Sequence, residues 1–356
     1  MEKTERIKKP RVAIASGKTR EEAVRKALEL VRDEITAKIK GRVLIKPNFL
    51  SSTYPIASTQ AEAVRPVLEL LNGITTDSII IAEGAAHSTK TAFGNFGYEE
   101  LARECNVKLV DLNCDNYSHQ FKILTQTRGS QIIRYSDLSA DVDTIISVAV
   151  AKTHDFATVT LSLKNMMGCL RRIHRPRMHG VELGSTIESI GESLWNVFDN
   201  YQTLMNAASG LVFSAVYMSR YIQKKKHHGA MPGYLSQVRA LSENLVRLGE
   251  VLMPDVAVID AFDAMEGDGP GGGTAVKMGI AAAGTDSIAC DAVMAYMMGF
   301  DPLSIGYLSL ANDRGIGTAD LKHIETIGEE PSLHARQLKP HSNHHIQMKW
   351  NEAWKE

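Results

Sequence analysis

The stretch that decides the fold is "DTIISVAV" at residues 143–150, followed by "AKTHDFATVTLSLKNMMGCLRRIHRPRMHG" at residues 151–180. An apolar run such as the first is typical of a strand buried on both faces of a sheet. The apolar residues after it recur at the spacing of a helix core face: Val159, Leu163, Met166, Met167 and Leu170. The pattern therefore predicts a buried strand followed at once by a helix.

The first half of the chain repeats this alternation. Strand-like segments "RVAIAS", "RVLIKPNF", "DSIIIAEG" and "VKLVDL" alternate with helix-like segments "TREEAVRKALELVRDEITAKI", "STQAEAVRPVLELLNG" and "GYEELARECN". Thr19 and Glu22 have the spacing of a capping box at the start of the first helix. Apolar strands alternating with helices predict an α/β fold, with a mostly parallel sheet covered by helices on both faces.

Four sections follow from the pattern along the chain. Residues 1–182 form an N-terminal α/β lobe, and residues 183–253 read as a helical insert or connector. A second, smaller α/β section covers residues 254–335, starting at "PDVAVIDAF" and passing through the glycine-rich "EGDGPGGG". Residues 336–356 form a polar tail rich in histidine.

Composition excludes several classes of protein. A net charge of −1 gives no sequence-wide attraction to nucleic acid. Neither a signal peptide nor an apolar run long enough to span a membrane is present. The four cysteines, Cys105, Cys114, Cys169 and Cys290, are scattered along the chain. This spacing argues against an iron–sulfur cluster and favours reduced thiols in the cytoplasm. The oligomeric state stays open, and a homo-oligomer is compatible with the sequence.

Polar residues gather where the predicted strands end. Lys46 stands at the end of one strand and Asn48 on the loop after it, His87 follows the next strand, and His154 follows "DTIISVAV". Ligands of parallel sheets bind beyond the carboxyl ends of the strands. We therefore expect Lys46 and Asn48 to bind an anionic or hydroxylated ligand, and His87 and His154 to move protons. The alternative for His87 is an ordinary solvated loop residue.

Lys164 separates two interpretations of the segment after the strand. A lysine on a core helix can extend its ammonium into water. If Lys164 instead points back toward the strand ends, partial burial lowers its pKa and makes it an acid/base or nucleophilic candidate. Arg171 and Arg172 add a basic rim suited to a carboxylate or phosphate. We expect the inward orientation.

Two further motifs carry weaker signals. "SGKT" at residues 16–19 lacks the first glycine of a phosphate-binding loop, because Val12 occupies that position. The glycine-rich segment carries Glu266 and Asp268 at a strand end, where carboxylates can bind a hard cation. The alternative for both carboxylates is ordinary surface solvation.

The ordered motifs "VLIKPNFLSSTYPIAST", "KTHDFATVTLSLKNMMGCL", "RPRMHG", "PDVAVIDAFDAMEGDGPGGG" and "GTDSIACDAVMAYMMGFDP" resemble the family known as domain of unknown function 362. The resemblance covers roughly residues 10–325, apart from the insert near 195–232. Some members of that family carry an appended ferredoxin-like domain with clustered cysteines. No such cysteines occur here.

A more distant resemblance connects the histidine and lysine pattern to the nickel-pincer lactate racemase family. It implies two α/β lobes around a cleft, with His154 and His87 as acid/base residues. Lys164 matches the lysine that carries the pincer cofactor, and His179, with His174 as competitor, matches a metal ligand. The segment "TVTLSL" before Lys164 is bulkier than the glycine-rich approach of that family. We therefore expect this protein to share the cleft of that family but not its pincer cofactor.

These observations favour an enzyme that applies histidine acid/base chemistry, of the racemase or epimerase kind, to a small anionic or hydroxylated metabolite in a cleft between the lobes. The alternative is a non-catalytic protein that binds a metal or a phosphorylated ligand, or handles a cofactor. The sequence leaves the substrate unnamed, and a divalent metal remains an open alternative as cofactor.

Overall fold

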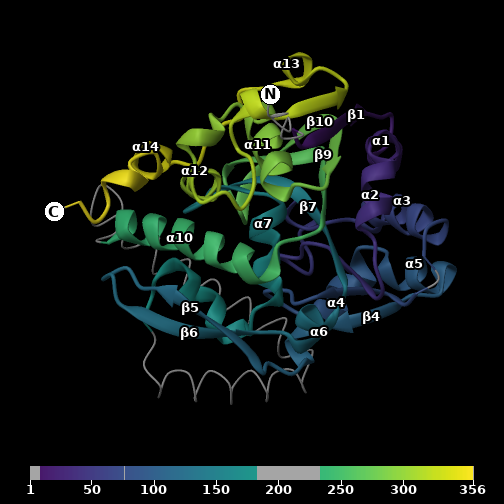
Figure 1. Ribbon diagram of the computed structural model, residues 1–356, viewed down its shortest axis with the longest axis horizontal. Coiled ribbons are helices and arrows are strands. Elements are labelled where there is room, and N and C mark those ends of the chain that lie inside the picture. Colours follow the sequence, from purple (N-terminus) through teal and green to yellow (C-terminus); the bar gives the residue numbers. More distant parts are fainter. Residues whose placement is uncertain (1–8, 76, 183–232, 356) are drawn as a thin grey trace, which may run out of the picture.

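The computed structural model describes residues 9–75, 77–182 and 233–355 (Figure 1). Within this part of the chain, nine strands form one sheet with the order β11-β1-β10-β9-β7-β2-β3-β4, and β8 pairs with β7. A separate two-stranded sheet consists of β5 and β6. The strands are β1 Arg11–Ser16, β2 Val43–Lys46, β3 Ile79–Glu83, β4 Lys108–Asp111, β5 His119–Leu124, β6 Ser130–Tyr135, β7 Thr144–His154, β8 Thr158–Thr160, β9 Val256–Asp268, β10 Gly272–Gly284 and β11 Glu325–Gly328.

Helices connect and cover these strands. The α-helices are α1 Arg20–Leu30, α2 Arg32–Lys38, α3 Ala61–Asn72, α4 Thr89–Asn95, α5 Tyr98–Cys105, α6 Asp137–Asp141, α7 Ser162–Asn165, α10 Tyr234–Leu252, α11 Ser287–Met297, α12 Gly306–Asp313, α13 Pro331–His334 and α14 His344–Gln347. The 3-10 helices are η1 Pro55–Ala57, η2 Leu112–Cys114, η3 Met166–Cys169, η4 Arg172–His179, η5 Pro302–Ser304, η6 Leu321–His323 and η7 Trp350–Glu352.

The sheet is mostly parallel, which confirms the α/β class. Strands β9, β7, β2, β3 and β4 run parallel to one another, and β11 runs parallel to β1. Only β1–β10, β10–β9 and β7–β8 are antiparallel among the pairs in the described sheet. Strands from residues 1–182 and from residues 254–335 share this one sheet: β1 lies between β11 and β10, and β7 pairs with β9.

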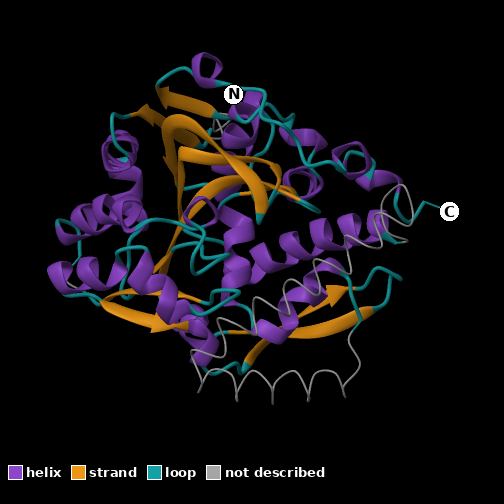
Figure 2. Ribbon diagram, turned by 180° about the vertical axis from the view of Figure 1, so that it is seen from behind, coloured by secondary structure: helices purple, strands orange, loops and turns teal. Residues whose placement is uncertain are grey.

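Helices lie on both faces of the sheet (Figure 2), and an apolar core fills the space on each face. Alternate residues of a strand point to opposite faces. In β2, Leu44 packs into the core that contains α10, α11 and α12, whereas Val43 and Ile45 pack into the core that contains α1, α3 and α5. Burial on both faces explains why the strands are nearly all apolar.

Several local predictions can be compared with the structure. The Thr19 side chain caps α1 by accepting from the Glu22 amide at 3.1 Å, as the capping-box spacing predicts. The predicted single helix after it divides at Val31 into α1 and α2. The prediction missed the β5–β6 hairpin.

The helix expected directly after "DTIISVAV" is wrong in its start and length. Strand β7 continues through His154, β8 folds back on it, and α7 has only four residues. The β-branched "TVT" at residues 158–160 favours a strand at this point because its side chains fit a pleated surface. The apolar residues at helical spacing are still buried.

The tail packs against the rest of the molecule. Leu338, Gln347 and Trp350 are buried, and α14 lies beside α10 (Figure 1). The expected helical insert is described only from residue 233 onward, where α10 has the predicted apolar face; residues 183–232 lie outside the described part. No described helix combines the length and hydropathy needed to cross a membrane.

Candidate active site

Three neighbouring parallel strands end on ionisable residues at one edge of the sheet. Lys46 ends β2, Glu83 ends β3 and His154 ends β7, and these strands are adjacent in the order β7-β2-β3. Their exposed fractions are 0%, 2% and 4%, respectively. Burial of charged or polar groups is costly unless each finds a partner, so this edge must contain a connected polar network.

Lys46 and Glu83 form the buried ion pair of that network. The Lys46 ammonium also donates to Pro47 O at 2.8 Å and to Asn165 Oδ1 at 2.9 Å. Burial raises the pKa of the Glu83 carboxyl, and Lys46 opposes that shift. Since a lysine ammonium has three N–H donors, Lys46 is fully occupied by protein acceptors and organises the edge.

Asn165 and Asn48 connect this ion pair to a second buried lysine. Asn165 Oδ1 accepts from Asn48 Nδ2 at 3.2 Å, while its amide donates to Lys46 O at 2.9 Å. Asn48 Oδ1 accepts from Lys152, which also donates to Ala57 O at 2.6 Å. Burial, followed by repulsion from Lys164, holds the pKa of Lys152 well below its usual value. Asn48 thus supports a lysine and is itself bound to protein groups.

His154 is fixed by its own backbone turn. Its Nδ1 accepts from the amides of Phe156 at 3.0 Å and Ala157 at 3.1 Å. Asp155 Oδ1 also lies 3.2 Å from Nδ1, but two amide hydrogens already point at that nitrogen, so we assign the lone pair to it. Burial, followed by the Lys164 charge, holds the pKa of His154 well below its usual value. The neutral ring therefore carries its proton on Nε2.

Lys164 lies on α7 and faces the same region as His154. It is half-buried, and its charge is the largest single electrostatic influence on the pKa of both His154 and Lys152. Burial lowers the pKa of Lys164 to about 8, against an opposing attraction from Asp155. Its ammonium donates to Met167 Sδ at 3.6 Å. These contacts match an inward orientation more closely than an ammonium extended into water.

His87 lies beyond β3, beside Arg172. Its carbonyl accepts from Arg172 Nη2 at 3.2 Å, and burial followed by the Arg172 charge lowers the His87 pKa. Strand β3 is separated from β7 by β2, so His87 and His154 lie beyond strands of the same half of the sheet. The Arg171 charge contributes to lowering the pKa of His174, and its backbone amide donates to Arg134 O at 3.0 Å.

The two predicted metal histidines occupy different surroundings. His179 stacks on His154, with ring centroids 6.3 Å apart and an angle of 16° between the rings. His174 Nδ1 accepts from the Arg134 amide at 2.9 Å, and burial followed by the Arg177 charge lowers its pKa to about 4. Across residues 9–75, 77–182 and 233–355, no group of three or more His, Cys, Asp or Glu side chains is arranged to hold a metal ion.

Glu266 and Asp268 hold the tail. Glu266 accepts from the Lys339 amide at 2.8 Å, and Asp268 accepts from the Ser342 amide at 2.8 Å. Asp268 also lies 3.6 Å from His341 Nε2. Both carboxylates thus anchor residues 339–342 to the end of β9. This role differs from the two predicted from the sequence, which were binding of a hard cation and exposure to solvent.

Residues that the sequence interpretation missed complete the edge. Arg175 donates to Ala85 O at 3.0 Å and to Asn113 Oδ1 at 2.7 Å, and thereby joins the loops after β3 and β4. Gln347 of the tail donates to His154 O at 2.9 Å. Lys152 could have been identified from the sequence as a site residue, because it is a charged residue directly after an apolar strand segment. The roles of Arg175 and Gln347 depend on contacts between segments far apart in sequence.

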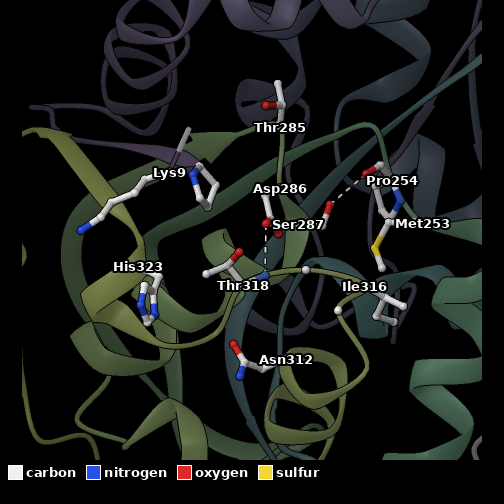
Figure 3. Close-up of a pocket in the computed structure, with 13 residues that line it drawn as sticks. Lys9, Met253, Pro254, Thr285, Asp286, Ser287, Asn312, Ile316, Thr318 and His323 are labelled. Atoms are coloured by element: carbon white, nitrogen blue, oxygen red, sulfur yellow. Dashed lines mark hydrogen bonds between the residues drawn. The ribbon is translucent and has the colours of Figure 1, made fainter. Parts of the chain in front are cut away.

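A pocket of about 670 Å³ lies at the opposite end of the strands, next to the start of β1 and β9 (Figure 3). In it, Asp286 accepts from the Thr318 amide at 3.1 Å, and Ser287 donates to Pro254 O at 3.0 Å. Asp286 also caps α11. None of the predicted site residues lines this pocket, and its Asp286, Ser287 and Asn312 side chains bind the surrounding backbone.

Comparison with known proteins places the chain in a family. Over 277 residues it is 22% identical to the thylakoid-associated protein sll1697 of Synechocystis sp., a match covering 77% of this chain and 68% of that protein. The lactate racemase apoprotein from Thermoanaerobacterium thermosaccharolyticum matches in structure with a TM-score of 0.42 and 14% identity. That match covers 82% of this chain, which spans 59% of the racemase chain. The family described as "Domain of unknown function (DUF362)" matches residues 43–296, more than half of the chain, and the protein therefore belongs to this family.

Proposed function

We propose that this protein is a small-molecule enzyme of the isomerase kind, in which His154 and Lys164 carry out acid/base chemistry on an anionic or hydroxylated metabolite. The observation that carries the proposal is the state of His154. Its Nδ1 lone pair is held by two backbone amides, and burial beside Lys164 keeps the ring neutral. A neutral imidazole in this arrangement donates a hydrogen bond from Nε2 to a substrate oxygen.

Lys164 supplies the complementary group. With a pKa of about 8, a substantial fraction of its amine is neutral near physiological pH and can accept a proton. His154 would stabilise the negative charge that develops on a substrate oxygen while Lys164 removes the proton from the adjacent carbon. His87, bound to Arg172 beyond β3, is the candidate for a second proton-transfer group on the other side of the substrate.

Hydrogen–deuterium exchange tests the proposal. The protein is incubated in D₂O with a panel of small 2-hydroxy and 2-oxo acids. Exchange is followed by NMR at C2 of the hydroxy acids and at C3 of the oxo acids, the carbons whose hydrogens are next to the carboxylate or the carbonyl. We expect exchange with at least one compound, and a reduction of roughly 10²- to 10⁴-fold in His154→Asn, because a positioned acid or base contributes that much. His323→Asn, a change in a largely exposed side chain beside the opposite pocket, should leave the rate unchanged.

The second candidate function is non-catalytic binding of a phosphorylated ligand. It is favoured by the positive charge that Lys164 and Arg172 bring to the same edge, where it acts on Lys152, His154 and His87. A ligand that raises the melting temperature of both the protein and His154→Asn, without any exchange in the panel, would support binding over catalysis.

A further inference from the structure

The three lysines at the carboxyl edge differ in their hydrogen-bond partners. Lys46 is bound by Glu83, a carbonyl and an amide oxygen, and Lys152 is bound by an amide oxygen and a carbonyl. Within the described part of the chain, the hydrogen-bond acceptor of Lys164 is the thioether of Met167, at 3.6 Å. A thioether is a weak acceptor, so it does little to hold the amine in its charged form.

Accessibility separates Lys164 in the same way. Lys46 and Lys152 are 0% and 1% exposed, whereas Lys164 is only partly buried. Its burial favours the neutral amine, which is the nucleophilic form of a lysine, although the nearby Asp155 charge opposes this effect. Lys164 therefore combines partial exposure, a weak hydrogen-bond acceptor and a lowered pKa.

We propose that Lys164 is an amine nucleophile that forms an imine with small 2-oxo acids. The inference deepens the proposed function, because it names the substrate class for which the Lys164 amine binds carbon as well as taking up protons. A carboxylate on the substrate is favoured because its negative charge offsets the positive potential that Lys164 creates at Lys152 and His154. A carbonyl next to that carboxylate lies within the reach of the same amine.

The step is balanced without an external oxidant or reductant. The Lys164 nitrogen lone pair forms the C–N bond, and the carbonyl π electrons move onto the oxygen, which accepts a hydrogen bond from His154 Nε2. A proton passes from nitrogen to oxygen and gives a carbinolamine. The second hydrogen of the nitrogen leaves as a proton, the hydroxyl takes it up, and water departs as the C=N bond forms.

Borohydride trapping tests the inference on the full-length protein. The protein is incubated at pH 8 with glyoxylate or with other 2-oxo acids of up to four carbons, reduced with sodium borohydride, digested and mapped by mass spectrometry. Acetaldehyde serves as the uncharged comparison. We expect the adduct on Lys164 to form roughly 100-fold faster than on the exposed Lys90, since an ordinary lysine is less than about 1% neutral at this pH. Lys46 and Lys152 in the same digest should stay unmodified.

The outcomes separate the two proposals. Loss of the adduct in Lys164→Arg, with circular dichroism unchanged, supports the inference. Labelling of wild-type Lys164 no faster than that of Lys90 overturns it, whether or not the variant folds. If Lys164 is trapped but no compound exchanges deuterium, the imine stands and the isomerase function fails. If exchange occurs without any trapping, the isomerase function stands and the imine is wrong.

Discussion

The protonation of Lys164 makes the free energy of unfolding depend on pH. Its folded pKa of about 8 lies below the usual value near 10.4, so between these values the unfolded chain binds more protons than the folded one. Stability contributed by this group therefore rises with pH over that window. Below pH 8 the folded protein bears the full cost of charging a partly buried amine.

Lys164→Met should consequently stabilise the protein at pH 7, by on the order of 1–3 kcal/mol in the free energy of unfolding, and the gain should shrink as pH approaches 10.5. Urea unfolding at several pH values measures this difference. Lys90→Met, at an exposed position on α4, is the matched control and should show no such trend. A gain that is constant with pH would contradict the burial of the Lys164 amine.

The buried Lys46–Glu83 pair should be sensitive to the loss of one partner. Glu83→Gln leaves a fully buried ammonium without its carboxylate, which should cost about 3–5 kcal/mol of the free energy of unfolding. The double variant Lys46→Met with Glu83→Gln should lose less than the sum of the single changes, because it leaves no unpaired charge. Additive losses in denaturant unfolding would show that the two groups do not stabilise each other.

At the scale of elements, α7 is too short to be stable by itself. Helices of this length depend on tertiary contacts, and the first turn of α7 receives them from α11. Asp291 on α11 accepts from the amides of Ser162 at 2.7 Å and Leu163 at 3.1 Å, and from the Tyr307 hydroxyl at 3.1 Å. This carboxylate therefore fixes the turn that carries Lys164.

Asp291→Ala should destabilise the protein by roughly 2–4 kcal/mol, because it leaves two amides and a hydroxyl buried without an acceptor. Asp291→Asn keeps one oxygen acceptor and should lose less. Thermal and urea unfolding measure both losses. If Asp291 also positions Lys164, borohydride trapping at Lys164 should slow in Asp291→Asn even where that variant is fully folded. An unchanged trapping rate would limit Asp291 to a stabilising role.

At the scale of the whole molecule, the central sheet joins both ends of the described chain. Strand β1 pairs with β10 and β11, and β7 pairs with β9. We propose that residues 1–182 and 254–335 form a single folding unit, with the tail at 336–356 packed on it. A fragment of residues 1–182 would expose the apolar edges of β1 and β7.

Residues 1–182 expressed alone should therefore lack a cooperative unfolding transition, whereas the full chain should unfold in one transition by circular dichroism and by fluorescence. Adding residues 233–356 as a separate chain should restore cooperative unfolding if the shared sheet is the cause. A stable, cooperatively unfolding 1–182 fragment would show that this section is an independent domain.

The sequence by itself determined the α/β class, the existence of most strands and helices, and the location of Lys46 and His87 at the carboxyl ends of β2 and β3. These features depend on local apolar periodicity and on the common direction of parallel strands, and both can be recognised from short segments of the sequence. The capping of α1 by Thr19 is of the same kind, because all of its atoms lie within one turn.

Only the tertiary structure decided how those residues are used. Lys46 binds Glu83 and Asn165, which lie 37 and 119 residues away, and the tail reaches His154 through Gln347, 193 residues away. The extension of β7 through His154 depends on β8 and β9, whose pairing no local pattern encodes. The role of each lysine depends on the hydrogen-bond acceptors that folding brings to it from distant segments. Lys46 receives a carboxylate, Lys152 an asparagine side chain and Lys164 only a thioether among the described residues. A buried charge can bind only the groups that are packed around it, so local sequence does not set these partners.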